Sequence, residues 1–247
     1  SFRMQVFLPD TKEKCPVIVD GDMCFPYFTH NDYVKTALDK NIAWAFFDRT
    51  ELAHDVRKEG RGHGQLYRAY PEYTFGALGA WGYSRCVDAL IQLGVIDESA
   101  ITYTGHSRGG KTAMLAGVLD TRAAIVCPND TNAGSCSCYR IHMSGINEKG
   151  EEKKSETLAD LYSKFGFWLG EGMADYIDRE NELPFDCHFL KAMVAPRTLF
   201  VSEAVHDIWG NPIGSWQPTK AAEELFDFLG AKDNLYWYFV RNFIHSM

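Results

Sequence analysis

A serine in a short glycine-rich segment is the residue of this chain best suited to chemistry. Residues 105–109 read Gly-His-Ser-Arg-Gly, between an apolar stretch at 101–104 and a helical stretch at 111–119. A nucleophilic serine needs a sharp strand-to-helix turn that exposes its Oγ, with glycines where a Cβ would meet the neighbouring strand or helix. The segment therefore predicts a nucleophile elbow with Ser107 as the nucleophile. The alternative is a glycine-rich turn with an inert serine.

A serine nucleophile needs a histidine as general base, and in this arrangement the histidine follows the last strand of the sheet. His245 comes just after the apolar stretch 235–240 and is predicted to be the base. His106 occupies the variable position of the elbow, and His188 precedes a predicted helix rather than following a strand. These two and His206 are weaker candidates.

Two aspartates could orient the histidine. Asp207 follows the apolar stretch that ends near Ser202, and Asp130 follows the one that ends at Cys127. Either carboxylate could accept the histidine Nδ1–H and stabilise the imidazolium. Aspartate is also common in turns, and spacing alone does not rank the two. We favour Asp207, because it follows the strand after which this arrangement usually carries its acid, whereas Asp130 occupies only an alternative position.

Strand and helix patterns alternate along the chain, which predicts one α/β domain over residues 1–247. Between the elbow helix and the last two strands, an insertion at about 131–195 carries little strand signal, a charged run at 148–155 and an aromatic cluster at 165–168. The expected fold is an α/β-hydrolase, a mostly parallel central sheet flanked by helices. Strands are predicted at 2–8, 16–20, 42–47, 101–104, 123–127, 198–201 and 235–240, helices at 31–39, 78–93, 111–119 and 220–229, and a long loop at 51–75.

Composition narrows the function classes. The 247 residues are 46% hydrophobic, enough for a full core, and the net charge of −8 without a basic run argues against nucleic acid as a partner. The apolar stretches are too short for a membrane span, and no signal peptide is visible at the start. The chain begins inside a predicted strand and ends two residues after His245, where the fold usually adds a helix, so we expect it to be trimmed.

Seven cysteines leave at least one unpaired, and they are expected to be core thiols. A zinc site could be drawn from four of them and one histidine. It lacks paired Cys-x-x-Cys spacing, so the sequence favours no metal and no organic cofactor. The residues of that alternative are Cys127, Cys136, Cys138, Cys187 and His188.

Several motifs beyond the elbow resemble one family, the bacterial glucuronoyl esterases of carbohydrate esterase family 15. The similarity covers most of residues 78–245, whereas the first 75 residues match only as a generic sheet. The motifs are Trp81-Gly-x-Ser-Arg85, Gly105-His-Ser-Arg-Gly-Gly-Lys-Thr-Ala113, Leu183-Pro-Phe-Asp-x-His188, Ala195-Pro-Arg197 and Asp207-Ile-Trp-Gly-Asn-Pro212.

The resemblance implies roles for individual residues. It assigns oxyanion binding to Arg108, contacts with sugar hydroxyls to Lys111, and the lining of the sugar site to Trp209. Fungal members carry their acid, a glutamate, at the position of Asp130, and bacterial members are similar to this chain at Asp207.

One expected feature of the family is missing from its place in the sequence. Family members often have a sugar-binding glutamate shortly after the segment matching Tyr139-Arg140, where this chain has Gly145 and Ile146. The chain therefore departs from the family pattern at one contact to the sugar.

The resemblance implies an esterase that hydrolyses 4-O-methyl-glucuronoyl esters, the links between xylan side chains and lignin alcohols, through an acyl-enzyme. It also suggests a secreted or periplasmic location. Two alternatives stay open: an esterase of another carbohydrate ester such as acetylated xylan, and a catalytically silent binding protein with a hydrolase fold.

Overall fold

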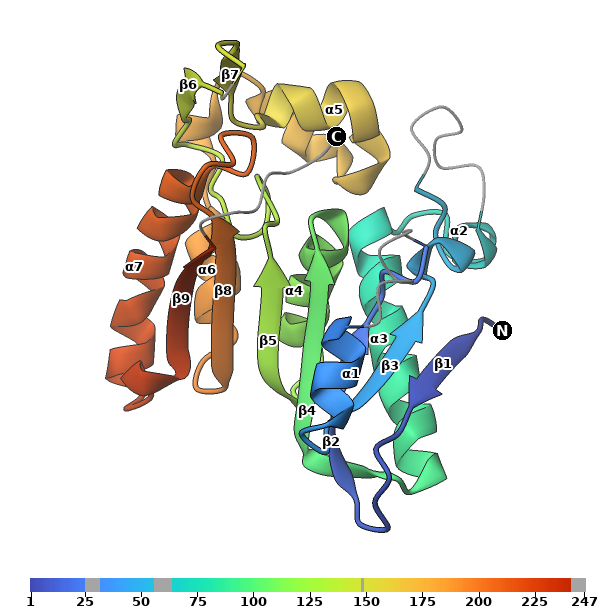
Figure 1. Cartoon of the computed structure of the whole chain (residues 1–247). Helices are drawn as coiled ribbons and strands as arrows, with labels where there is room; N and C mark the ends of the chain where they lie inside the picture. The colour runs from blue at the N-terminus through green and yellow to red at the C-terminus, as the bar shows by residue number, and fades with distance from the viewer. Residues whose placement is uncertain (25–31, 56–63, 148, 241–247) are drawn as a thin grey trace.

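The computed structural model of the chain describes residues 1–24, 32–55, 64–147 and 149–240. Their strands form a seven-stranded sheet in the order β1-β3-β2-β4-β5-β8-β9 (Figure 1). β1 runs antiparallel to β3, and the other neighbours are parallel. The strands are Met4–Phe7 (β1), Cys15–Asp20 (β2), Ala43–Phe47 (β3), Ile96–His106 (β4), Ala123–Asn129 (β5), Thr198–Ala204 (β8) and Leu235–Val240 (β9).

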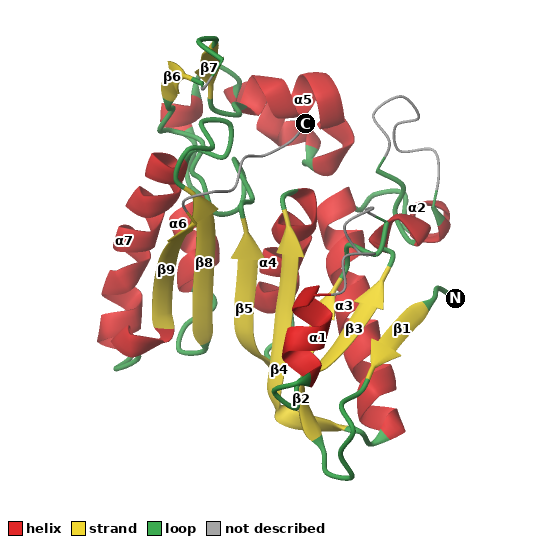
Figure 2. Cartoon of the chain, in the orientation of Figure 1, coloured by secondary structure: helices red, strands yellow, loops and turns green. Residues whose placement is uncertain are grey.

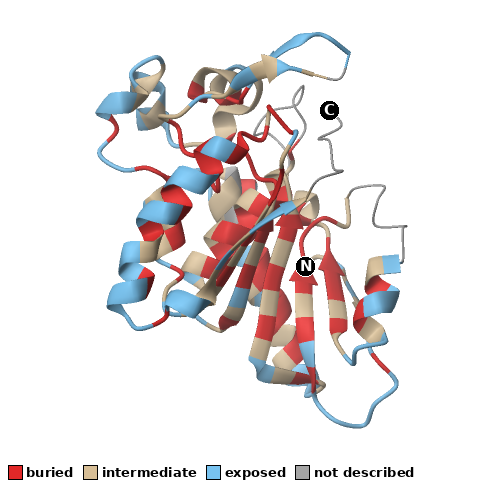
Figure 3. Ribbon diagram, turned by 60° about the vertical axis from the view of Figure 1, so that its left-hand side comes forward, coloured by how far each residue is buried: buried red, intermediate tan, exposed pale blue. Residues whose placement is uncertain are grey.

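The core lies on the middle strands, where buried residues are concentrated (Figure 3). Val17 and Val19 of β2 and Ala43, Ala45 and Phe46 of β3 are fully buried. Near-continuous apolar sequence is typical of parallel strands that helices cover on both faces. The parallel strands bring their carboxyl ends to one edge of the sheet, where polar side chains can meet; these strands are β2, β3, β4, β5, β8 and β9.

Helices cover both faces of this sheet (Figures 1 and 2). In the view of Figure 1, α1 (Asp32–Leu38) lies in front of the sheet, and α3 (Phe75–Leu93) and α4 (Arg108–Leu119) pack side by side behind it. α6 (Cys187–Ala192) contacts α4 and α7 (Pro212–Phe228), which continue the rear layer toward β9. The helix that follows the elbow is therefore packed firmly against the sheet.

The insertion between β5 and β8 forms a layer above the carboxyl ends of the strands (Figure 1). A small hairpin, β6 (Ser144–Ile146) and β7 (Glu152–Lys154), precedes α5 (Leu158–Phe165) and a series of short 3-10 helices. A second hydrophobic cluster joins this layer to the loop after β3, since Leu158, Leu161 and Ala53 share it. The insertion therefore roofs the edge at which the elbow stands.

Several predicted boundaries differ from the structure. The helix predicted at 78–93 begins at Phe75, and the one predicted at 220–229 is the second half of α7, whose start is set by the Asn211 cap and Pro212. The predicted loop 51–75 contains the short helix α2 (Gln65–Ala69). His188 lies inside α6 rather than before a helix. A helix cap or a helix of one or two turns involves only a few residues, so the polar sequence around it hides its pattern.

Candidate active site

Ser107 stands at a sharp turn between β4 and α4. β4 ends at His106 and α4 begins at Arg108, so the turn is made at Ser107 alone. Its backbone adopts φ 55° and ψ −118°, a strained conformation for a residue with a side chain. Ser107 N donates to Asn129 O at 2.8 Å, and Lys111 N donates to Ser107 O at 3.0 Å. The predicted strand–turn–helix geometry is confirmed.

Two glycines leave the space that this turn requires. A Cβ on Gly105 would lie 2.6 Å from the carbonyl carbon of Gly109, so the strand and the helix could not approach. A Cβ on Gly109 would lie 1.9 Å from Oδ1 of Asp22. The neighbour of Gly109 is therefore a buried carboxylate from the loop after β2, where the sequence predicted only a strand or helix.

The two candidate acids point toward one place. Asp130 follows β5 and Asp207 follows β8, and their exposed fractions are 1% and 4%. A Cβ on Gly210 would lie 2.7 Å from Asp130 Oδ1 and 2.8 Å from Asp207 Oδ2. Asp130 N donates to Ser202 O at 2.8 Å, which ties the end of β5 to β8. The structure brings both carboxylates together at the carboxyl edge of the sheet.

A third carboxyl group, that of Glu203, is buried next to Asp130. Its side chain is fully buried, accepts a hydrogen bond from Ser215 Oγ at 2.8 Å and also hydrogen-bonds with Asp130. Burial and the charge of Asp130 raise the pKa of Glu203 well above its ordinary value. A protonated Glu203 donates to Asp130 and so favours Asp130 as a carboxylate. The sequence analysis missed Glu203, because it lies within a strand pattern.

Arg108 is held from two sides. Its Nη1 donates to Asp55 Oδ1 at 3.1 Å and to Asp55 O at 3.4 Å. Its guanidinium lies over the rings of Phe165 and Trp168, 4.8 and 5.4 Å from their centroids. These rings stack on each other with their centroids 4.1 Å apart. The aromatic cluster predicted in the insertion thus contacts the elbow directly.

Lys111 lies one helical turn beyond Ser107, and its side chain is 14% exposed. Its Nζ donates to Glu156 Oε2 at 3.1 Å, and also to the carbonyls of Thr131 and Ala133. Lys111 is thereby linked both to the loop after β5 and to the insertion. Its ammonium group is fixed close to the elbow.

Glu156 connects Lys111 to Trp209. Glu156 N donates to Trp209 O at 3.2 Å, and Trp209 is half-buried, with the Nζ of Lys164 lying 4.2 Å from a ring centroid. The structure therefore links Lys111, one turn after the elbow, to a carboxylate of the insertion, and links that residue's backbone to Trp209. Hydroxyl groups and the face of a sugar ring are the ligands that such a set suits.

A family model described as "Glucuronyl esterase, fungi" matches residues 1–230 of the chain. The chain belongs to the glucuronoyl esterase family. The predicted family resemblance is confirmed.

Curated members of the glucuronoyl esterase family give the same result in sequence. The 4-O-methyl-glucuronoyl methylesterase of Podospora anserina is 34% identical over 200 residues, which are 78% of this chain and 40% of that protein. A methylesterase of the same name from Phanerochaete chrysosporium is 31% identical over 198 residues, 78% of this chain and 41% of that protein. The chain thus spans about 40% of the length of these curated relatives.

Solved glucuronoyl esterases share the fold. The carbohydrate esterase family 15 enzyme from Caldicellulosiruptor kristjansonii has a TM-score of 0.85 and 28% identity, covering 99% of this chain and 68% of that chain. The catalytic domain from Hypocrea jecorina has a TM-score of 0.79 and 27% identity, covering 98% of this chain and 64% of that chain. The predicted α/β-hydrolase fold, with an insertion before the last two strands, is confirmed.

Where glucuronoyl esterases often have a sugar-binding glutamate, the sequence of this chain has Gly145 and Ile146. Gly145 and Ile146 lie in β6, and Ile146 is 70% exposed. Glu156, which follows the hairpin, stands beside Lys111 instead. The sequence analysis missed it, because Glu156 directly follows the charged run 148–155 and gives no separate signal.

His245 lies outside the described residues. Of the other histidines, His106 is half-buried at the end of β4, with its Nδ1 3.4 Å from Asn129 Nδ2. His188 is half-buried in α6 against the ring of Phe189, and His206 is exposed after β8.

The cysteines are unpaired, and Cys24 and Cys127 are the two that are partly exposed. Burial raises the pKa of Cys136 to about 12, so its thiol is a poor nucleophile at neutral pH. Among the described residues, no group of three or more histidine, cysteine or acidic side chains could hold a metal ion. The zinc alternative therefore finds no support in this part of the chain.

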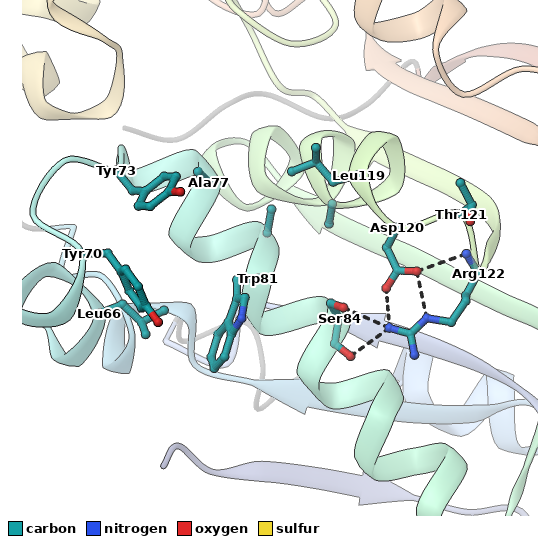
Figure 4. A pocket seen from close by; sticks show the side chains of 12 residues that line it. Leu66, Tyr70, Tyr73, Ala77, Trp81, Ser84, Leu119, Asp120, Thr121 and Arg122 are labelled. Carbon is teal, nitrogen blue, oxygen red and sulfur yellow. Dashed lines mark hydrogen bonds and ion pairs between the residues drawn. The ribbon is translucent and has the colours of Figure 1, made fainter.

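A cavity of about 700 Å³ lies away from the elbow, on the outer side of α3 and α4 (Figure 4). Tyr70, Tyr73, Trp81 and Leu119 line it, and an ion-paired cluster around Arg122 closes one end. None of the predicted site residues that the structure describes lines this cavity. In the described parts of the chain, no helix is long and apolar enough to cross a membrane.

Proposed function

We propose that this chain is a serine esterase that hydrolyses 4-O-methyl-glucuronoyl esters through an acyl-enzyme. The observation that carries the proposal is the grouping of Lys111, Glu156 and Trp209 beside the strained elbow at Ser107. Curated relatives at 31–34% identity are 4-O-methyl-glucuronoyl methylesterases, which supports the same substrate class.

In the proposed reaction, Ser107 Oγ attacks the ester carbonyl while His245 takes its proton. The first N–H groups of α4 have no partner within the helix and point toward the elbow, and together with Arg108 they would bind the oxyanion. His245 then protonates the leaving alcohol, and water hydrolyses the acyl-enzyme. This sequence of steps requires no metal ion and no organic cofactor.

We propose Asp207 as the main partner of His245 and Asp130 as the second carboxylate. Val205 N donates to Val240 O at 3.1 Å, so the chain leaves β9 next to the loop that carries Asp207. β8 separates β9 from β5, which carries Asp130. A histidine after β9 therefore has the shorter route to Asp207.

We propose that Lys111, Glu156 and Trp209 hold the glucuronate ring. A sugar hydroxyl would replace one of the three present acceptors of the Lys111 ammonium, and the Glu156 carboxylate would accept from the neighbouring hydroxyl. The face of the Trp209 indole that Lys164 does not cover would pack against the sugar ring. Binding of the acyl sugar by these groups would place its ester carbonyl at Ser107, one helical turn away. We also propose that the protein acts outside the cytosol. The proposed ester is part of glucuronoxylan, a polymer too large to enter a cell.

The test compares hydrolysis of methyl 4-O-methylglucuronate with that of p-nitrophenyl acetate. We expect a higher kcat/KM on the glucuronate ester and no measurable turnover by Ser107→Ala, since losing a triad member removes many orders of magnitude. A preference for the acetate would favour an acetyl esterase. Failure of a fluorophosphonate to label the wild-type serine would favour a non-catalytic binding protein.

A further inference from the structure

Arg108 is the outermost member of a buried series of alternating charges. Its Nη1 lies 3.1 Å from Asp55 Oδ1, and Asp55 Oδ2 lies 3.1 Å from Arg49 Nη1. Arg49 Nε lies 3.3 Å from Asp22 Oδ1. The exposed side-chain fraction falls from 30% at Arg108 to 2% or less at the other members. Two carboxylates and two guanidinium groups thus form a network of alternating charges that is buried except at Arg108.

The far end of this network returns to the elbow. Asp22 Oδ2 accepts a hydrogen bond from the backbone N–H of His106 at 2.7 Å, directly before Ser107. Asp22 Oδ1 also occupies the space where a Cβ on Gly109 would be, two residues after Ser107. The network therefore contacts the chain on both sides of the nucleophile and ends on Arg108 itself.

We propose that Asp22, Arg49 and Asp55 are positioning residues that hold the Arg108 guanidinium in a fixed place relative to Ser107. The inference rests on the proposed function, in which Arg108 binds the oxyanion. Both hydrogen bonds from Arg108 to Asp55 use Nη1, so Nε and Nη2 are not committed to Asp55. Those two nitrogens are the donors that the network leaves for the developing negative charge.

A free arginine side chain has many rotamers, and ordering it in the transition state would reduce its benefit. Donors that the fold has already placed stabilise a transition state without further reorganisation. Here the hydrogen bonds from Nη1 to Asp55 fix the guanidinium in place. The rings of Phe165 and Trp168 cover its face. The ordering of Arg108 is thus completed when the chain folds.

The network is rigid because its members depend on one another. Burial lowers the pKa of Arg49, but the carboxylates of Asp22 and Asp55 outweigh this effect and raise it above its ordinary value. Burial raises the pKa of Asp55, and Arg49 and Arg108 act in the opposite direction. Removing one charge would leave the others unpaired in a medium of low dielectric constant. Alternative arrangements of the four side chains are therefore disfavoured.

A double-mutant cycle separates positioning of Arg108 from a general structural role. Asp55→Asn and Arg108→Gln are measured singly and together on methyl 4-O-methylglucuronate. We expect Arg108→Gln to lower kcat by about 100-fold, as for loss of one oxyanion donor. Asp55→Asn should lower kcat by about tenfold with KM within about threefold, and by less than about threefold when Arg108 is already replaced.

The control is Asp120→Asn, which breaks another aspartate–arginine pair at the opposite end of α4 and should leave kcat unchanged. If Asp55→Asn does not fold, Asp55→Glu keeps the charge and moves it by one methylene, and kcat should again fall with little change in KM. Independent, multiplicative losses at Asp55 and Arg108, or no loss in either Asp55 variant, would overturn the positioning role alone. An Arg108→Gln variant with normal kcat would overturn both that role and the proposed oxyanion binding.

Discussion

Asp130 and Asp207 face the same glycine, so the choice of triad acid depends on which one reaches the histidine. We predict that Asp207→Asn lowers kcat by about 10⁴-fold, as an aspartate-to-asparagine change does in serine proteases. Asp130→Asn should cost far less, because Asp130 is already engaged with Glu203. Both variants are compared at neutral pH on one glucuronate ester, with circular dichroism to check folding. A larger loss at Asp130 would transfer the role to that residue.

Lys111 and Glu156 are expected to act on substrate binding. Lys111→Ala and Glu156→Gln should each raise KM for the glucuronate ester by about tenfold or more, the effect of losing a hydrogen bond to a charged group. The kcat/KM for p-nitrophenyl acetate should change little, since acetate has no sugar to hold. Equal losses on both substrates would instead indicate that the Lys111–Glu156 pair only stabilises the insertion.

At the scale of elements, the end of α4 is anchored by a cluster that is visible in Figure 4. Asp120 caps the helix and pairs with Arg122 at 2.6 Å (Figure 4). Outside that view, Tyr103 of β4 donates to Asp120 at 2.9 Å. Partial burial raises the pKa of Asp120, but the hydrogen bonds from Arg122 and Tyr103 outweigh it and lower the pKa to about 2. The cluster therefore stabilises the folded state through the ionised form of Asp120.

The sign of the pH dependence follows from that lowered pKa. The stabilisation is fully present above the ordinary pKa of 3.8 and is lost as the pH falls toward about 2. We predict that Asp120→Asn lowers the free energy of unfolding by about 1 kcal/mol at pH 7, since a partly exposed pair is screened by water. Urea unfolding at pH 7 and at pH 2.5 should show the difference shrinking. If the difference in unfolding free energy between wild type and Asp120→Asn stayed constant with pH, the assignment would be contradicted. The control is Glu223→Gln, which removes a carboxylate from the exposed pair with Lys220 and should change the free energy of unfolding little at either pH.

At the scale of the whole molecule, the insertion is tied to the sheet through the elbow. The Arg108 side chain of α4 lies between Asp55, after β3, and the rings of the insertion. Leu66 packs against both hydrophobic clusters. These contacts support our proposal that residues 1–247 form one domain.

We therefore predict a single cooperative unfolding transition in which the insertion and the sheet unfold together. Far-ultraviolet circular dichroism follows the sheet and helices, and tryptophan fluorescence includes Trp168 in the insertion. The two signals should give the same midpoint in denaturant. Separate transitions, with fluorescence changing first, would show that the insertion unfolds by itself.

The features of this protein that depend on local patterns could be predicted from its sequence. The elbow around Ser107 and the apolar central strands were readable, because strand periodicity and glycine spacing are properties of neighbouring residues. The helix boundaries were less accurate, since the Asn211 cap of α7 gave only a short polar signal.

Contacts between residues far apart in the sequence became known only from the folded chain. Asp22, Arg49 and Asp55 lie on the loops after β2 and β3, and only the strand order places these loops against the elbow on β4. Glu156 reaches Lys111 because the insertion folds back over the carboxyl edge of the sheet. The physical reason is the same in both cases: a buried ion pair is stable only when folding brings both charges together away from water, and no local pattern in the sequence records that pairing.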